Sequence, residues 1–468
     1  MANGRGAHRG RSGWIASGAV LALLAGYVAA DAYDVVPGVL TTSPPEADAQ
    51  PYPGVRLPGP RPVAATVDAL DPDAPVPDAA AVEAAIARVV DESTIGGDVS
   101  VRVLDAASGD LLAERDPDVS VPVASSAKIL TAAGALYALG PDTRFTTRVV
   151  TAGGGLIVLV GGGDVLLGGD ASDPEAVRGH AGLGDLADQV ATELEGSGTT
   201  SVTLAVDDST FTGEPYAADV EGLDQSFTMA ATTVAVNTGA VDGVYTADPA
   251  MGATEAFAER LRERGIDVTV EGRHTTSDAD RTIASVESAT VSQIVREMLV
   301  DSDNAIADVL SRLVALERDL PGDAAGGGQA VVDVLAELGI DTTGTHMIDG
   351  AGLSISDSAT ATSLTDLLQL SQDGSVPEIA GLVPSLPVSS LDGTLGDRLG
   401  GEGAGRVRAK TGSLVQYSSL TGTVLTVDER LLTFSVIMHS FDPGGLWEAR
   451  ALIDSFVEDL ANCGCSGS

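Results

Sequence analysis

Val123-Ala124-Ser125-Ser126-Ala127-Lys128 leads directly into a run with helical character, Ile129 to Leu139. It contains a Ser-x-x-Lys tetrad at the start of the expected helix. Residues three apart lie on the same face of a helix, one turn from each other. The Ser125 hydroxyl and the Lys128 amine can therefore meet. A lysine whose pKa is lowered by burial or by a nearby cation can accept a proton from such a hydroxyl. The pair alone is a weak signal, because serine and lysine often occur at this spacing by chance.

Lysine is rare in this chain. Of the 26 residues that are Lys or Arg, only Lys128 and Lys410 are lysines. A chain that uses arginine for nearly every positive charge is expected to keep lysine where arginine fails, because arginine is not deprotonated in proteins. The alternative is an arginine-biased genome that left two lysines by chance.

Bulk composition indicates a globular body. The chain has 468 residues, of which 44% are hydrophobic and 20% charged, which suits two or three domains. The net charge of −41 argues against nucleic acid as a partner, because phosphates would be repelled. Cys463 and Cys465 are too close together to staple a fold, and we interpret them as part of a tail without a redox or metal function.

The N-terminus predicts export. Three arginines precede the apolar run 14–30, and Asp31 follows it. This pattern is typical of a signal peptide or signal anchor, which we assign to residues 1–35. The remainder of the chain would then lie outside the cytoplasm. Residues 36–77 are rich in Pro, Ala and Asp and predict an extracytoplasmic linker without a core of its own.

Hydrophobic periodicity predicts the elements of the remaining chain. Helices are expected at 78–90, 129–139, 291–300, 305–316 and 446–460. Strands are expected at 99–104, 111–113, 148–151, 156–160, 202–206, 268–270, 420–427 and 431–439, with a turn at 105–109. The short, glycine-punctuated strands between about 144 and 282 indicate a domain inserted into another.

Two further motifs follow the tetrad. Ser302-Asp303-Asn304 lies at the start of an expected helix, and on its own it is equally typical of a helix N-cap. Lys410-Thr411-Gly412-Ser413 follows the strand-like segment 406–409. A strand end with a tight turn would account for this second motif, but not for the presence there of one of only two lysines.

Ser-x-x-Lys, Ser-x-Asn and Lys-Thr-Gly in this order resemble the signature of penicillin-binding proteins and serine β-lactamases. More narrowly, the chain is similar to the class C low-molecular-mass D-Ala-D-Ala carboxypeptidase/endopeptidase family. The narrower resemblance rests on the 177 residues from Ser125 to Ser302, on Asp349-Gly-Ala-Gly-Leu-Ser354, and on the segment 386–395 with Arg398 after it. The family has a serine where this chain has Ala351. The resemblance covers roughly residues 78–460.

The resemblance implies an α+β fold. An antiparallel sheet covered by helices would form a penicillin-binding/transpeptidase-like domain from residues 78–143 and 283–460. A β-rich domain, residues 144–282, would be inserted between the Ser-x-x-Lys and Ser-x-Asn motifs. Residues 461–468 would form a tail.

The resemblance also implies the catalytic roles. Ser125 would attack the carbonyl of a D-Ala-D-Ala bond and form an acyl-enzyme, and Lys128 would accept its proton. Ser302 would relay a proton to the leaving amine. The backbone N–H groups of Ser125 and Ser413 would form the oxyanion hole.

The substrate-binding residues follow from the same resemblance. Asn304 would orient the peptide through its amide, and Lys410 with Thr411 would bind the terminal carboxylate. Gly412 would let the substrate strand lie close to the backbone. The expected partners are peptidoglycan stem peptides ending in D-Ala-D-Ala, with β-lactam antibiotics as covalent inhibitors.

No metal or cofactor is implied, because the histidines are scattered without His-Glu-x-x-His spacing. Two alternatives stay open. A serine β-lactamase would need fast deacylation, and Asn304 lacks the glutamate four residues earlier that one β-lactamase class carries. A non-catalytic cell-wall-binding scaffold is disfavoured by the complete set of motif residues. The five histidines are His8, His180, His274, His346 and His439.

Overall fold

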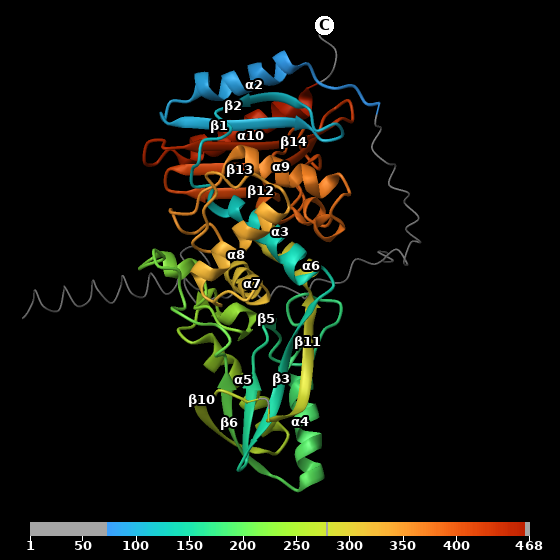
Figure 1. Ribbon diagram of the computed structural model, residues 1–468, viewed down its shortest axis with the longest axis vertical. Helices are drawn as coiled ribbons and strands as arrows, with labels where there is room; N and C mark the ends of the chain where they lie inside the picture. Colours follow the sequence, from blue (N-terminus) through green and yellow to red (C-terminus); the bar gives the residue numbers. More distant parts are fainter. Residues whose placement is uncertain (1–72, 278, 464–468) are drawn as a thin grey trace, which may run out of the picture. The chain divides into compact units, whose positions relative to one another are not determined.

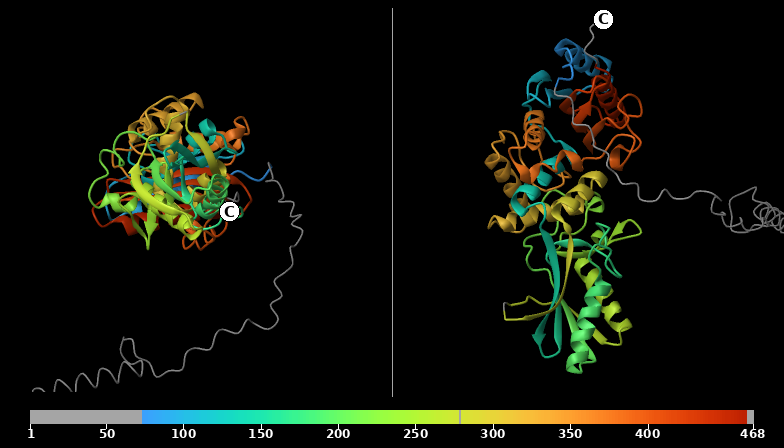
Figure 2. Two further views of the ribbon diagram at one scale, coloured as in Figure 1. Left: turned by 90° about the horizontal axis from the view of Figure 1, so that it is seen from below. Right: turned by 90° about the vertical axis from the view of Figure 1, so that its right-hand side faces the viewer.

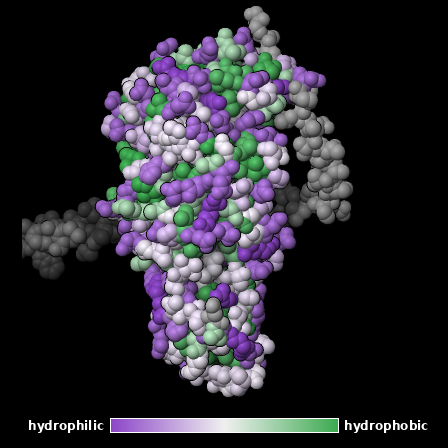
Figure 3. All heavy atoms as spheres, viewed as in Figure 1, coloured by the Kyte–Doolittle hydropathy of each residue, from purple (hydrophilic) through white to green (hydrophobic). Residues whose placement is uncertain are grey.

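The computed structural model describes residues 73–277 and 279–463 (Figure 1). These residues belong to one compact unit, residues 69–468. The apolar run 14–30, most of the expected linker and Cys465 lie outside the described residues. Within the described ranges, no helix combines the length and the apolar character needed to cross a bilayer. Hydrophilic residues spread over the face shown in Figure 3, interrupted by smaller apolar patches.

Five antiparallel strands form the first sheet, in the order β12-β13-β14-β1-β2. β1 pairs with β14 along its whole length, from Asp98 opposite His439 to Asp105 opposite Leu432. Segments from the two ends of the described chain therefore share one sheet. The strands are β1 (Asp98–Asp105), β2 (Leu111–Arg115), β12 (Val407–Leu414), β13 (Tyr417–Leu425) and β14 (Leu431–His439).

Two helices cover one face of this sheet, α2 (Ala79–Glu92) and α10 (Leu446–Asn462), and they also contact each other (Figure 1). α2 begins at Asp78, whose side chain accepts a hydrogen bond from the Ala80 N–H and so caps the helix. Its apolar face packs on the sheet, as the sequence periodicity predicts. The buried residues of α2 are Val82, Ala85, Ile86 and Val89.

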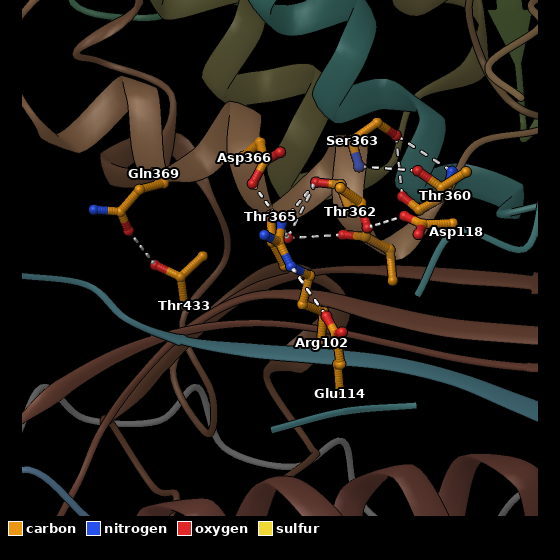
Figure 4. Close-up of polar contacts among 11 residues, drawn as sticks. Arg102, Glu114, Asp118, Thr360, Thr362, Ser363, Thr365, Asp366, Gln369 and Thr433 are labelled. Atoms are coloured by element: carbon orange, nitrogen blue, oxygen red, sulfur yellow. Dashed lines mark hydrogen bonds and ion pairs between the residues drawn. The ribbon is translucent and has the colours of Figure 1, made fainter. Parts of the chain in front are cut away.

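Arg102 of β1 ties α9 (Ala361–Gln372) to the opposite face of the sheet (Figure 4). Its guanidinium donates to Thr365 Oγ1 at 3.0 Å and pairs with Asp366 on the same helix. On the sheet side, Arg102 Nε lies 3.7 Å from a carboxylate oxygen of Glu114 in β2. These polar contacts link the helix to two strands beside its apolar contacts with the sheet.

α3 (Lys128–Leu139) is the central helix of the described chain. It is buried from Lys128 to Leu136 on every side, which is typical of a core helix rather than an amphipathic surface helix. Three helices pack around it, and they bring the second motif close to the first. They are α6 (Val291–Asp301), α7 (Asn304–Glu317) and α8 (Ala324–Glu337).

A second five-stranded sheet, in the order β10-β6-β4-β3-β11, is formed by residues between the first two motifs. β6 pairs in parallel with β10 and β4, and the other pairs are antiparallel. The strands are β3 (Arg144–Gly153), β4 (Leu156–Val160), β6 (Ser201–Asp207), β10 (Asp267–Arg273) and β11 (Arg281–Thr290). Two small two-stranded sheets lie outside it, β5 (Asp164–Leu167) with β7 (Val234–Val236) and β8 (Ala240–Val241) with β9 (Val244–Tyr245).

The sequence pattern predicts strands in this region but neither of its helices. α4 (Leu183–Ser197) and α5 (Pro249–Glu263) pack against the second sheet and against each other (Figure 2). β11 continues to Thr290, so its pairing with β3 extends past the predicted boundary at residue 282. The domain boundaries themselves stay a prediction.

A buried ion pair supports the turn predicted at 105–109. Arg430 donates through Nε and Nη2 to Asp105 Oδ2, at 2.9 and 2.6 Å, and both residues are buried. Asp105 Oδ1 also accepts from the Ala107 N–H at 2.8 Å, which closes the turn. The Asp105 carboxylate therefore connects the turn between β1 and β2 to Arg430, which lies in the turn between β13 and β14.

We predict that Asp105→Ala lowers the free energy of unfolding by about 3–5 kcal/mol, because it removes the carboxylate that pairs with the buried guanidinium of Arg430. Urea unfolding followed by circular dichroism measures the change. Glu193→Ala is the matched control, since it breaks an exposed pair with Arg281 and is expected to cost less than about 1 kcal/mol. Equal losses in the two variants would contradict the prediction.

Candidate active site

Ser125 lies in a short 3-10 helix, η1 (Ala124–Ala127), that leads directly into α3. Ala124 has φ 51°, in the left-handed region that side chains disfavour. Such strain persists only where the surroundings hold the backbone in place. Ser419 of β13 supplies one restraint, because its Oγ donates to the Val123 carbonyl at 2.7 Å. Ser126 Oγ lies 2.8 Å from the same Ser419 oxygen.

Lys128 is fully buried and faces Ser125. Its Nζ donates to Ser125 Oγ at 3.0 Å, as the Ser-x-x-Lys spacing predicts. The same amine donates to Asn304 Oδ1 at 2.6 Å and to the Ala351 carbonyl at 2.7 Å. Three acceptors from three separate segments therefore fix the amine beside the hydroxyl.

Burial lowers the pKa of Lys128 to about 8, because the charged amine has lost its contact with water. The carboxylates of Asp349, Asp303 and Asp357 oppose this effect and raise the pKa. A fraction of Lys128 is therefore neutral near pH 7, which a proton acceptor requires.

Asp349 organises the loop that presents the Ala351 carbonyl. Its Oδ1 accepts from the N–H groups of Ala351 and Gly352, both at 2.6 Å, and its Oδ2 accepts from the Ser354 N–H at 2.8 Å. The family resemblance includes this segment but implies no role for the aspartate. An aspartate followed by Gly-Ala-Gly is the available signal, since short acidic side chains bind nearby backbone N–H groups in turns.

Ser302 and Lys410 form a second pair. Ser302 ends α6 with φ 57°, and its Oγ accepts from Lys410 Nζ at 2.9 Å. Lys410 is fully buried and also donates to the Thr411 carbonyl at 2.9 Å. Burial, followed by the charges of Lys128 and Arg398, lowers the pKa of Lys410 well below its ordinary value. Its amine points at Ser302 rather than toward solvent.

The Ser-Asp-Asn motif divides its functions between two residues. Asp303 is the N-cap of α7 and accepts from the Ile306 N–H at 3.1 Å, so the N-cap interpretation holds for this residue. Asn304 points toward the site, because its Oδ1 contacts Lys128. Its Nδ2 donates to the Phe227 carbonyl at 2.9 Å.

The Lys-Thr-Gly motif lies on the edge strand β12. Thr411 Oγ1 lies 3.0 Å from Thr394 Oγ1, and Ser413 Oγ accepts from Arg450 Nη2 at 2.9 Å. A Cβ on Gly412 would lie 2.2 Å from Ser419 Oγ and 2.4 Å from the Val123 carbonyl. Residue 412 therefore has to be glycine because it packs against the turn that carries Ser125. The reason expected from the sequence is a different one, the close approach of the substrate strand.

Within residues 73–277 and 279–463, no group of three or more His, Cys, Asp or Glu side chains is arranged to hold a metal ion. The hydrogen bonds described above form two groups of side chains. Lys128 joins Ser125 to Asn304, and Lys410 contacts Ser302. The two groups are neighbours in the chain, because Ser302 and Asn304 are two residues apart. The arrangement suits nucleophilic attack by a serine with lysine as the base.

Comparison with known proteins also indicates a peptidase. The family model for D-Ala-D-Ala carboxypeptidase 3 (S13) matches residues 82–247 and 238–460. A carboxypeptidase of Mycobacterium tuberculosis is 34% identical over 433 residues, covering 88% of this chain and 91% of the relative. The carboxypeptidase DacB of Mycolicibacterium smegmatis is 33% identical over 473 residues, covering 97% of this chain and 98% of the relative.

Among solved structures, penicillin-binding protein 4 of Haemophilus influenzae matches with a TM-score of 0.66 and 18% identity, covering 80% of this chain and 98% of that chain. This likeness confirms the predicted α+β fold with its inserted domain. The sequence matches confirm the peptidase class predicted from the three motifs. The chain belongs to the D-Ala-D-Ala carboxypeptidase 3 (S13) family.

Proposed function

We propose that this chain removes the terminal D-alanine from peptidoglycan stem peptides through an acyl-enzyme on Ser125. The observation that carries the proposal is the contact between Lys128 Nζ and Ser125 Oγ at 3.0 Å, with the amine fully buried and its pKa lowered to about 8. A neutral amine at this distance can take the hydroxyl proton as the oxygen attacks.

The reaction proceeds in two stages. Ser125 Oγ bonds to the carbonyl carbon between the two alanines while Lys128 takes the hydroxyl proton, and the N–H groups of Ser125 and Ser413 hold the oxyanion. The carbon–nitrogen bond then breaks as the Ser302 hydroxyl gives its proton to the leaving amine and regains the proton that Lys128 had taken, so that both groups return to their starting states. Water finally attacks the ester carbonyl carbon and gives a proton to Lys128, which passes it to Ser125 Oγ as the ester bond breaks and the shortened peptide leaves.

Lys410 acts on Ser302 in this scheme. Its amine donates to Ser302 Oγ, which fixes the hydroxyl and favours transfer of the serine proton to the leaving group. The family resemblance implies that Lys410 binds the terminal carboxylate directly. Its complete burial and its bond to Ser302 support an indirect role instead.

Other aspects of the function rest on relatives and on the N-terminal sequence. Penicillin-binding protein 4 of Haemophilus influenzae has been solved in complex with a β-lactam, which supports covalent inhibition of this chain by β-lactams. We propose cleavage of peptide cross-links as a second activity of the same site. We also propose that residues 14–30 direct export and either anchor the protein or are removed.

The rate of acylation should depend on the protonation of Lys128. Because only the neutral amine accepts a proton, we expect the acylation rate to rise about tenfold per pH unit below pH 8 and to level off above it. Stopped-flow measurement with a fluorescent penicillin between pH 6 and 10 checks this, with Ser125→Ala as the blank. A flat profile over that range would contradict the assignment of Lys128 as the base.

The proposed function is tested with the full chain, a peptide ending in D-Ala-D-Ala and a fluorescent penicillin. We expect release of D-alanine and a long-lived penicillin adduct. Rapid turnover of the penicillin without cleavage of the peptide would instead identify a β-lactamase. Neither an adduct nor cleavage would identify a non-catalytic scaffold.

A further inference from the structure

The Ser-Asp-Asn motif lies at a junction of two helices. α6 ends at Asp301, and α7 begins at Asn304. Only Ser302 and Asp303 connect the two helices. Ser302 has φ 57°, in the left-handed region that side chains disfavour. Such strain persists only where the surroundings hold the backbone, so other contacts have to keep this junction in place.

The junction concentrates negative charge. Glu297 and Asp301 lie four residues apart on one face near the end of α6, where the partial negative charge of the helix end disfavours anions. Asp303 adds a third carboxylate two residues later. Arg296 of α6 does not offset these charges, because it pairs with Asp392. The compensating cation therefore comes from another segment.

Arg178 supplies this cation from the loop 168–182, between β5 and α4. Its Nε donates to Glu297 Oε1 at 2.6 Å, and its Nη2 donates to Asp303 Oδ2 at 2.9 Å. Nη2 also lies 3.9 Å from a carboxylate oxygen of Asp301. The planar guanidinium therefore bridges α6 and α7 across the two-residue junction.

Neighbouring contacts hold Arg178 in this position. Its Nη1 donates at 3.1 Å to Oδ1 of Asn237, the residue that follows β7. Val177, the residue before it, packs against the core that contains α3 and α6. A small apolar cluster joins β5 and β7 to the first turns of α7 (Figure 1). The buried members of this cluster are Val165, Met229, Ala235, Ala305 and Val309.

The charge of Asp303 also acts on Lys128. Burial is the largest effect on the pKa of Lys128 and lowers it, whereas nearby carboxylates raise it. Arg178 offsets the charge of one of these carboxylates, Asp303. Loss of Arg178 would therefore raise the pKa of Lys128 and leave less of its neutral amine at a given pH. Titratable side chains that interact with the charge of Lys128 are Asp349, Asp303, Asp357 and Lys410.

We infer that Arg178 is a positioning residue for the Ser-Asp-Asn motif. By bridging α6 and α7, it keeps Ser302 Oγ 2.9 Å from Lys410 Nζ. The same bridge keeps Asn304 Oδ1 2.6 Å from Lys128 Nζ. The inference rests on the proposed function, and it adds a residue from the region of the second sheet on which acylation depends.

Arg178→Gln in the full chain is expected to lower the acylation rate at saturating fluorescent penicillin about 30-fold, because a small displacement of Ser302 or Asn304 slows the reaction. The midpoint of the pH profile should also move from near pH 8 to higher pH, by roughly half a unit. Stopped-flow fluorescence measures both values. Arg281→Gln is the matched control, since it breaks an exposed pair with Glu193 and should change neither value.

Asp303→Asn tests the same contact from the α7 side, and it decides the question if Arg178→Gln does not fold. Asparagine can still cap the helix but carries no charge. We therefore expect the rate to fall about tenfold and the midpoint to move to lower pH, opposite to the shift in Arg178→Gln. In the Asp303→Asn background, Arg178→Gln should cost less than about threefold.

Thermal unfolding checks that each variant is folded. A folded Arg178→Gln or Asp303→Asn protein that acylates at the wild-type rate with an unchanged midpoint would overturn the inference alone. An undiminished loss from Arg178→Gln in the Asp303→Asn background would overturn it as well, because Arg178 would then act elsewhere. A wild type that forms no adduct would overturn the proposed function, and the inference with it.

Discussion

The Lys128→Arg protein is expected to form no covalent penicillin adduct within hours, a loss of at least about 1,000-fold in acylation rate. Arginine stays protonated in proteins and cannot accept the Ser125 proton. In the wild type the lysine amine is the only side-chain amine that contacts Ser125 Oγ among the described residues. The variant keeps a positive charge, so the loss would report on proton transfer rather than on charge.

The buried position calls for a second variant. Lys128 is fully buried, and the wider guanidinium can disturb the packing around α3. Lys128→Met has a side chain of similar length without an amine and is expected to lose acylation to the same extent. Stopped-flow fluorescence measures the rate, and thermal unfolding shows whether each variant is folded. A folded variant of either kind that acylates at the wild-type rate would contradict the role of Lys128.

Lys410→Met is expected to lower the acylation rate about 100- to 1,000-fold. The substitution removes the donor to Ser302 Oγ and leaves that hydroxyl without its partner at 2.9 Å. Because Lys410 and Ser302 would act as one unit, Ser302→Ala alone should cost a similar factor. The double variant should be little slower than either single variant.

A double-mutant cycle on the acylation rate measures this coupling. Independent effects, in which the two losses multiply, would show that Lys410 acts elsewhere than through Ser302.

The sequence predicts much of the fold because its periodicity is local. The apolar face of α2, the β1–β2 turn and the long strand β14 are all visible as hydrophobic patterns within a few residues. The order of the three motifs predicts the family, and this resemblance, together with the rarity of lysine, predicts that both lysines serve one site. α4 has comparable periodicity, with Leu183, Leu186, Ala187, Val190 and Leu194 buried, but glycine-rich strands dominate its surroundings.

The parts of the site that the sequence analysis misses depend on contacts between distant segments. Residue 412 has to be glycine because a Cβ there would collide with the Val123 carbonyl. The Lys128 amine donates to the Ala351 carbonyl, which belongs to the loop that Asp349 organises. Arg450 lies 37 residues after Ser413 in the chain and meets it only because α10 packs on the sheet. Such pairings depend on the tertiary arrangement, which the spacing of a motif does not contain.

The central claim is that Ser125 is the nucleophile that forms the acyl-enzyme. Its most direct test is the intact mass of the full chain after incubation with penicillin, followed by mapping of the modified peptide. We predict one adduct on the peptide that contains Ser125, its absence in Ser125→Ala, and its retention in Ser126→Ala, whose hydroxyl faces Ser419. An adduct that persists in Ser125→Ala, or that maps to another residue, would contradict the account.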